Sequence, residues 1–232
     1  MRAGKSHPRN DQTRSRAVYT LGSGRSMSDP NDSPSPLDEV RSLTFSGAVL
    51  FEASLVLVAA VLSWVFGVPL LGDLSWSGKG CLLGVSSALP LIAFFIWILQ
   101  SSYPPFVEVR LFLEQFVARM FGRWSIPQLA LLSIVAGVGE EILFRGVLQP
   151  GMAKITTPAV GLIVASFAFA LCHALTKAYF ISTFVIGIYL SLVWQAADNL
   201  LAPIITHALY DFVALLYFLR WYPRNREEEK ED

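Results

Sequence analysis

Long apolar stretches separated by short polar ones dominate the chain after residue 46. Residues 47–67 contain one charged residue, Glu52, and residues 80–99 contain none. A helix needs about 20 apolar residues to cross the hydrocarbon core of a bilayer. Further apolar segments follow at about residues 128–149, 159–176, 179–197 and 201–221. The pattern therefore predicts an all-α fold, a polytopic transmembrane helical bundle of about six spans.

Residues 104–124 have a different pattern, in which apolar side chains recur at helical spacing among charged ones. The apolar positions are Phe106, Val109, Phe112, Leu113, Phe116 and Phe121. Such a helix has one apolar and one charged side, which is typical of a helix lying in the membrane interface. We therefore expect an interfacial amphipathic helix in addition to the spans.

The two ends of the chain are polar. Residues 1–44 are rich in Ser, Arg, Asp and Pro, which predicts a disordered tail, and no charged segment leading into an apolar one begins at Met1, so we expect no secretory signal peptide. The predicted organisation is a tail at 1–44, two transmembrane helices and the interfacial helix at 45–126, four transmembrane helices at 127–222, and a charged tail at 223–232.

Composition supports a membrane protein and argues against other classes. Of 232 residues, 53% are hydrophobic and 16% charged, and the mean hydropathy is +0.50, so the lipid bilayer is the expected surrounding. The net charge is zero, which argues against a nucleic-acid partner because such surfaces need an excess of Lys and Arg. Cys81 and Cys172 lie in apolar runs without a CxxC pair, so neither a disulfide framework nor a thiolate zinc site is indicated.

The positions of the basic residues predict the topology. With six spans and the N-terminal tail in the cytoplasm, fifteen of the 18 Lys and Arg residues lie on the cytoplasmic side, whereas Lys79 and Lys154 lie on the other side. The positive-inside rule therefore predicts a multi-pass protein with both termini in the cytoplasm. The expected location is a bacterial plasma membrane.

Six ionisable residues interrupt three of the last four apolar segments. They are Glu140, Glu141 and Arg145 in 128–149, His173 in 159–176, and His207 and Asp211 in 201–221. An Asp or Arg at the centre of a membrane helix costs about 2.5–3.5 kcal/mol. Glu140, Glu141 and Arg145, all within the segment at 128–149, would together cost roughly 8–10 kcal/mol if they faced lipid. We therefore expect all six to face the interior of the bundle or a wet cavity.

Helical spacing pairs several of these residues. Glu141 and Arg145 are four positions apart and so can pair on one face of a helix, as can His207 and Asp211. Histidine can change its charge near neutral pH and is a common base or metal ligand. A purely structural ion pair of Glu141 with Arg145 remains an open alternative.

The same residues form three motifs on successive segments: EExxxR at Glu140–Arg145, FxxxH at Phe169–His173, and HxxxD at His207–Asp211. In this order, over about residues 128–218, they resemble the CPBP family of intramembrane proteases, which includes the CAAX prenyl endopeptidases and the Abi proteins of bacteriocin processing and immunity. The resemblance implies an intramembrane endopeptidase whose catalytic core is the last four spans, 127–222.

The resemblance also implies roles for the site residues. Glu140 and His173 would activate a water molecule, and His207 and Asp211 would lie on the side of the oxyanion. Glu141 and Arg145 complete the catalytic set by fixing the helix. Phe144 and Phe169 are the candidate substrate-binding side chains. The CAAX endopeptidases commonly have Asn where this chain has Asp211, and an ionised Asp cannot donate a hydrogen bond to an oxyanion.

A zinc mechanism uses some of the same residues. Glu140, His173 and His207 would form a His₂Glu ligand set with an open position for water. Spacing alone does not decide between the two mechanisms, and we favour the metal-free one, without a cofactor, because the resembling CAAX endopeptidases are understood that way.

The expected substrate is a lipidated CAAX-type protein or another membrane-associated protein or peptide, and no residue chooses between these. Two other classes stay open. A proton-coupled transporter or channel would use the intramembrane Glu and His residues as a proton relay. A non-enzymatic immunity or partner protein would use the same cavity for binding only.

Overall fold

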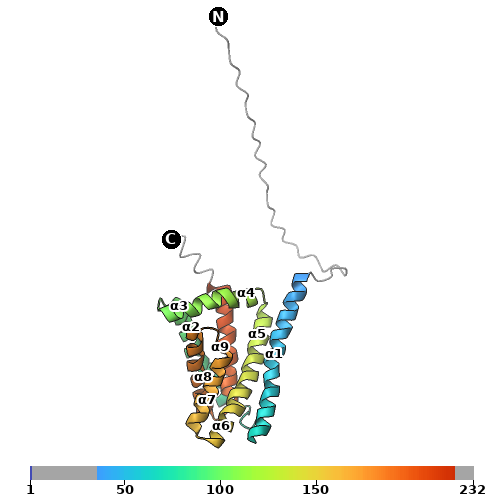
Figure 1. Ribbon diagram of the computed structural model, residues 1–232, viewed down its shortest axis with the longest axis vertical. Coiled ribbons are helices and arrows are strands. Elements are labelled where there is room, and N and C mark those ends of the chain that lie inside the picture. The colour runs from blue at the N-terminus through green and yellow to red at the C-terminus, as the bar shows by residue number, and fades with distance from the viewer. Residues whose placement is uncertain (2–35, 223–232) are drawn as a thin grey trace.

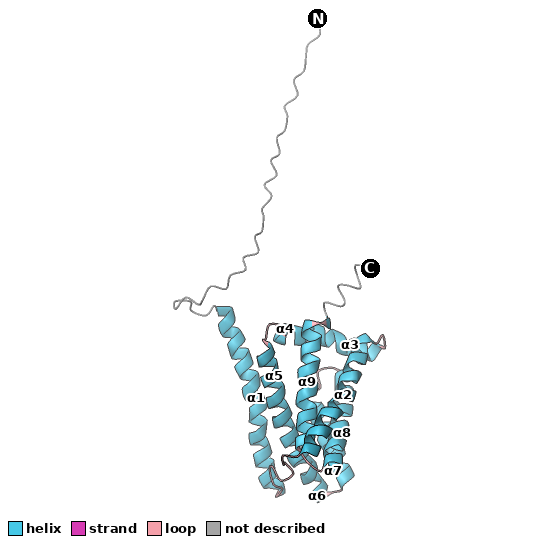
Figure 2. Cartoon of the chain, turned by 180° about the vertical axis from the view of Figure 1, so that it is seen from behind, coloured by secondary structure: helices cyan, strands magenta, loops and turns pink. Residues whose placement is uncertain are grey.

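A computed structural model describes Met1 and residues 36–222 of the chain, with side chains from Thr44 onward. The elements are α1 (Pro36–Phe66), α2 (Gly78–Gln100), α3 (Pro104–Phe112), η1 (Leu113–Val117), α4 (Ala118–Phe121), α5 (Ile126–Glu141), η2 (Ile142–Leu148), α6 (Gln149–Ile155), α7 (Pro158–Cys172), α8 (Lys177–Ala197) and α9 (Leu201–Arg220). The segments η1 and η2 are π-helical. The described residues contain no strand, and the predicted all-α helical bundle is confirmed (Figure 2).

The first helix begins earlier than the sequence pattern predicts. The sequence pattern predicts a disordered tail through residue 44, but α1 starts at Pro36. A proline is tolerated in the first turn of a helix because the N–H group it lacks would have no helical partner there. The structure therefore moves this boundary, whereas the rest of the predicted tail and the C-terminal tail at 223–232 lie outside the described residues.

Four of the described helices are long and apolar enough to cross a membrane: α1 from Thr44, α2, α8 and α9. The remaining two predicted spans are α7, with 15 residues, and the continuous helical stretch α5–η2–α6, which contains the charged motif. Apolar side chains cover the outer surface of the long helices, as Leu50, Leu82 and Ile181 illustrate. The chain is therefore an integral membrane protein.

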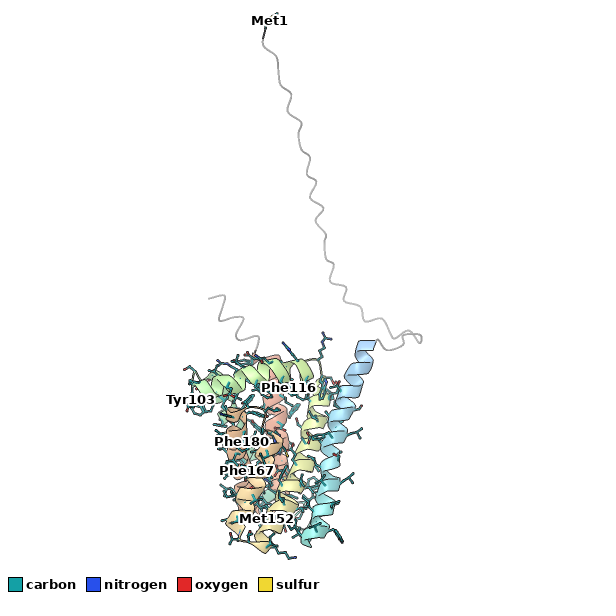
Figure 3. The ribbon with its side chains drawn as sticks, viewed as in Figure 1. Met1, Tyr103, Phe116, Met152, Phe167 and Phe180 are labelled. Atoms are coloured by element: carbon teal, nitrogen blue, oxygen red, sulfur yellow. The ribbon has the colours of Figure 1, made fainter. Side chains whose placement is uncertain are left out.

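The predicted interfacial helix is continuous through α3, the π-helical η1 and α4, and it runs across one end of the bundle (Figure 1). The first turns of α1 and the last turns of α9 lie at that same end (Figures 1 and 2). Arg220, at the end of α9, donates hydrogen bonds to the carbonyl oxygens of Gly122 and Trp124, just after α4. Tyr103, before α3, and Met152, in α6, mark the two opposite ends of the bundle (Figure 3).

Polar residues at the helix starts explain why the helices begin where they do. Ser77, Thr157 and Thr176 each accept a hydrogen bond from a backbone N–H group in the first turn of α2, α7 and α8. Ser125 and Gln128 form a reciprocal pair at the start of α5. Such caps satisfy N–H groups that have no partner within the helix.

The core of the bundle brings distant parts of the sequence together. Helix α9 packs against α2 and α5, α7 packs against α8, and α1 packs against α5 and η2. The hydroxyl group of Thr206 in α9 donates to the carbonyl oxygen of Gly84 in α2 over 3.0 Å. A Cβ atom at Gly84 would lie 2.9 Å from the carbonyl oxygen of Ala202, so this glycine lets the two backbones approach. The packing of α9 against α2 and α5 positions its two ionisable residues inside the bundle.

Candidate active site

Two consecutive glutamates at the end of α5 point to different environments. Glu140 lines a cavity, whereas Glu141 is fully buried between helices. Neighbouring residues of a helix lie about 100° apart around its axis, so adjacent side chains cannot share a face. The doubled glutamate of the EExxxR motif therefore supplies one group to the cavity and one to the packed interior.

Glu141 is the centre of a buried network of charges. Its Oε1 atom lies 2.7 Å from Nη1 of Arg145 and 2.7 Å from Nδ1 of His207. Arg145, which is fully buried, also donates to the carbonyl oxygen of Gly187 in α8 over 2.9 Å, and its guanidinium group lies 4.7 Å from the centre of the Phe169 ring. Removing one partner of such a buried pair leaves an uncompensated charge, at a cost of about 3–5 kcal/mol. Glu141 and Arg145 thus tie α5, α8 and α9 together.

His207 lies between two acidic side chains. Its Nδ1 atom faces Glu141, and its Nε2 atom lies 3.3 Å from Oδ2 of Asp211. Carboxylates accept hydrogen bonds but do not donate them, so Nδ1 donates to Glu141 when it carries a proton. The contact of Nε2 with Asp211 is an ion pair when the ring is protonated. The HxxxD spacing therefore places the Asp211 carboxyl group on the ring nitrogen that points away from Glu141.

A glycine allows α5 and α9 to meet at this network. A Cβ atom at Gly137 would lie 2.9 Å from the backbone nitrogen of Ala208, next to His207. A separation below 3.0 Å does not occur for real Cβ atoms, so a larger residue would push the helices apart. The absence of a side chain at Gly137 therefore brings Glu141 within hydrogen-bond distance of His207.

His173 lies just beyond α7, as its C-cap, whereas the sequence pattern placed it inside a span. Its backbone N–H group donates to the carbonyl oxygen of Ala170, three residues back, over 3.0 Å. The carbonyl oxygen of Phe169 lies 2.8 Å from Nδ1 of the His173 ring. A carbonyl oxygen only accepts hydrogen bonds, so Nδ1 carries the proton and Nε2 is left for other contacts. At the end of α7, the FxxxH spacing therefore places the carbonyl oxygen of Phe169 on Nδ1 of His173, and this hydrogen bond fixes the tautomer of the ring.

Glu140 and His173 face each other in the cavity. Nε2 of His173 lies 3.9 Å from Oε1 of Glu140, beyond a direct hydrogen bond. One water molecule can hydrogen-bond to both atoms, because 3.9 Å is less than two hydrogen-bond lengths, about 5.6 Å. The two groups are therefore placed to share a water molecule.

The cavity, of about 240 Å³, has a polar part and an apolar part. The polar part contains Glu140, His173, His207 and Asp211. The apolar part extends to the underside of α3, η1 and α4, where its wall includes Val109, Leu113, Val117 and Phe121. The interfacial helix therefore covers the apolar part of the cavity.

The two predicted substrate-binding aromatic residues occupy different places. Phe169 lines the cavity and contacts both histidine rings, with ring centres 4.8 Å from His173 and 5.8 Å from His207. Phe144 packs behind it, edge to face, with ring centres 5.4 Å apart, and does not line the cavity. Phe169 is thus positioned to touch a molecule in the cavity, whereas Phe144 supports Phe169.

Residues outside the three motifs also line the polar part of the cavity. Glu52 comes from α1, and Tyr179, Ser182 and Thr183 come from the first turns of α8. The sequence signal for Glu52 was available, since it is the one charged residue in an apolar segment, but nothing in the sequence indicated which neighbour it contacts. The residues of α8 carried no signal, because Ser, Thr and Tyr are common in transmembrane helices.

The fit of a metal ion can be tested on the three predicted zinc ligands. Within residues 44–222, whose side chains the structure describes, no group of three or more His, Cys, Asp and Glu side chains is arranged to hold a metal ion. Both ring nitrogens of His207 face carboxylate oxygens, at 2.7 and 3.3 Å, so neither is free for a metal. Glu140, His173 and His207 as arranged therefore do not fit a zinc site.

The fold and the site together define a helical integral membrane protein with a buried carboxylate and histidine centre. Residues 122–213 match the family model of the Rce1-like type II CAAX prenyl endopeptidases. The resemblance predicted from the three motifs is therefore confirmed for this segment.

A curated relative covers part of the chain. YpbD of Bacillus subtilis (strain 168), an uncharacterized protein, is 35% identical over 98 residues, which is 41% of this chain and 48% of YpbD. The match thus spans about half the length of that relative. No solved structure matches the chain.

Proposed function

We propose that this protein is an intramembrane endopeptidase that hydrolyses a peptide bond with water activated by Glu140 and His173. The observation that carries the proposal is the 3.9 Å separation of Glu140 Oε1 and His173 Nε2 in a cavity inside the membrane domain. The match of residues 122–213 to a family of prenyl endopeptidases supports the same chemistry.

In the first step, the oxygen of the water molecule attacks the carbonyl carbon of the peptide bond, and one water proton goes to Glu140. His173 orients the water through Nε2, because its Nδ1 proton is held by the carbonyl oxygen of Phe169. In the second step the C–N bond breaks, and the proton moves from Glu140 to the leaving nitrogen. Glu140 then returns to the carboxylate form.

His207 is the proposed stabiliser of the tetrahedral intermediate. With both ring nitrogens protonated, it presents Nε2–H beside the cavity, 3.3 Å from Oδ2 of Asp211. The oxyanion would accept a hydrogen bond from this Nε2–H group. Asp211 then acts by orienting His207, because an ionised carboxylate cannot itself donate to the oxyanion.

The proposed substrate is a membrane-associated or lipidated protein or peptide. Its apolar part would enter the cavity below α3 and η1, and its peptide bond would lie between Glu140 and His173. The apolar wall formed by residues such as Val109 and Leu113 supports this class. The proposed location is a bacterial plasma membrane with both termini in the cytoplasm, supported by the position of Lys79 and Lys154, at the start of α2 and in α6, away from α3.

The test is cleavage of a panel of quenched, lipidated peptides by the purified protein in lipid vesicles. We expect cleavage by the wild type and a loss of about 10²–10⁴-fold in Glu140→Ala and His173→Ala. Glu108→Ala, at an exposed position of α3, is the matched control and keeps full activity. Equal cleavage by wild type and Glu140→Ala would overturn the proposal. Proton or solute flux that depends on Glu140, without cleavage, would favour a transporter instead.

A further inference from the structure

Glu52 is the one charged residue of α1 between Thr44 and Phe66, and it lies outside the segment that matches the endopeptidase family. Most of this span faces outward, since only 6% of the residues in its most apolar stretch are buried inside the bundle. A carboxyl group in such a helix is costly unless it faces the bundle interior and finds a partner. Glu52 faces the interior, because its side chain lines the polar part of the cavity.

A close approach of two helices brings Glu52 to the site. A Cβ atom at Gly139 in α5 would lie 2.6 Å from the backbone carbonyl oxygen of Glu52. The backbones of α1 and α5 therefore touch at this level because Gly139 has no side chain. Since Gly139 directly precedes Glu140, the contact brings the two glutamates, which both line the cavity, to the same level of the bundle.

The carboxyl groups of Glu52 and Glu140 both line the polar part of the cavity, from helices whose backbones touch. Oε2 of each is buried, and no N–H or O–H donor of the described residues satisfies it. A carboxylate accepts hydrogen bonds but does not donate them, so a bond between two carboxyl groups requires one shared proton. His173 Nε2, at 3.9 Å, is too far to orient Glu140 directly.

We propose that Glu52 is a positioning residue of the active site, whose carboxyl group hydrogen-bonds Glu140 and holds it facing His173. The inference rests on the proposed function of Glu140. It adds a helix outside the family-matched segment to the active site, since α1 carries Glu52. It also gives Gly139 a role, which is to keep α1 close enough for the hydrogen bond.

Kinetics of two substitutions test the hydrogen bond. Glu52→Gln keeps a donor, because its amide N–H₂ group can donate to the Glu140 carboxylate, whereas Glu52→Leu removes it. We expect kcat of Glu52→Leu to fall by about 10- to 100-fold with KM within about twofold, because a misplaced catalytic group affects the transition state. Glu52→Gln should restore kcat to within about threefold of the wild type. Ala53→Leu, at an exposed position of α1, is the control and leaves kcat unchanged.

A substitution in α5 tests whether the contact of α1 with Gly139 is what lets Glu52 act on Glu140. Gly139→Ala should move α1 away and lower kcat as Glu52→Leu does, although Glu52 is intact. The kcat of the double variant Glu52→Leu/Gly139→Ala should be no lower than that of the slower single variant, because both changes remove the same contact. Multiplied losses in the double variant would contradict the proposed route.

Infrared spectroscopy tests the shared proton without a substrate. The wild type should show the absorption band of a protonated carboxyl group, and both Glu52→Gln and Glu140→Gln should remove it. Absence of this band, or its survival in either variant, would overturn the inference. Full activity of Glu52→Leu beside an inactive Glu140→Ala would also overturn it while leaving the proposed function intact. A wild type that cleaves nothing, with the band behaving as expected, would contradict the proposed function but support the contact.

Discussion

Glu141 and His207 are 66 positions apart in the sequence, yet Oε1 of the glutamate lies 2.7 Å from Nδ1 of the histidine in the interior of the bundle. The same oxygen accepts a hydrogen bond from Arg145. One buried carboxylate thus pairs with the guanidinium group of Arg145, four residues along the chain, and orients the ring of His207 on α9. This arrangement links the stability of the helix packing to the geometry of the site.

Replacing Arg145 with Ala should lower the free energy of unfolding by about 3–5 kcal/mol, because it leaves the Glu141 carboxylate buried without its cation. Unfolding in detergent, followed by circular dichroism, measures this. Arg119→Ala, at an exposed position of α4, should change the value by less than about 0.5 kcal/mol. Equal effects of the two substitutions would show that the buried pair is not important for stability.

Gly137→Ala should lower the free energy of unfolding by about 1–3 kcal/mol, because its Cβ atom would lie 2.9 Å from the backbone nitrogen of Ala208. Activity should fall as well, since the separation of α5 from α9 lengthens the contact of Glu141 with His207. Gly47→Ala is the matched control, because a Cβ atom there meets nothing within 4 Å. A Gly137→Ala protein as stable and active as the control would refute the close-approach argument.

Asp211→Asn should keep activity within about tenfold, because the Asn carbonyl can still accept a hydrogen bond from Nε2 of His207 and its amide adds a donor for the oxyanion. Asp211→Leu, which offers neither, should lose about 100-fold or more in kcat. Steady-state kinetics on one peptide compares the two. An inactive Asn variant would mean that the negative charge of Asp211 is itself required.

Filling the apolar part of the cavity should weaken substrate binding. Leu113 lines the cavity from η1, and Leu113→Trp should raise KM by about tenfold with little change in kcat, because the new side chain occupies space for the substrate. Leu111→Trp places the same side chain on the exposed side of α3 and should leave KM unchanged. A lower kcat at constant KM in Leu113→Trp would argue that this wall does not bind substrate.

Treatment with a strong chelator should leave the rate of peptide cleavage unchanged, because both ring nitrogens of His207 face carboxylate oxygens. The measurement compares the treated protein with a sample to which zinc is then added. Loss of activity that zinc restores would establish a metal mechanism and require His207 to rearrange.

Much of the architecture was predictable from the sequence, because membrane helices need long apolar segments and their ends carry recognisable caps. Helix starts near Pro158 and Lys177 follow from Thr157 and Thr176. The π-helical turns at η1 and η2 were not predictable, since the apolar pattern does not reveal a shift from four to five residues between hydrogen-bonded groups.

Contacts within one helix were also predictable. The pairing of Glu141 with Arg145, and of His207 with Asp211, needs only a helix and a spacing of four residues. The cost of burying charges in a membrane further indicated that these residues face inward. The sequence by itself therefore determined which residues gather inside the bundle and which neighbours share a face.

Contacts between helices were decided by the tertiary structure alone. The distance from Glu140 to His173 depends on the end of α7, and the approach of Glu52 to Glu140 depends on the missing side chain of Gly139. The physical reason is that a backbone approach of a few tenths of an ångström makes or breaks a hydrogen bond, whereas apolar periodicity specifies only which face of a helix is buried. The chemistry of the residues was present in the sequence, and the helix packing decided which of them touch.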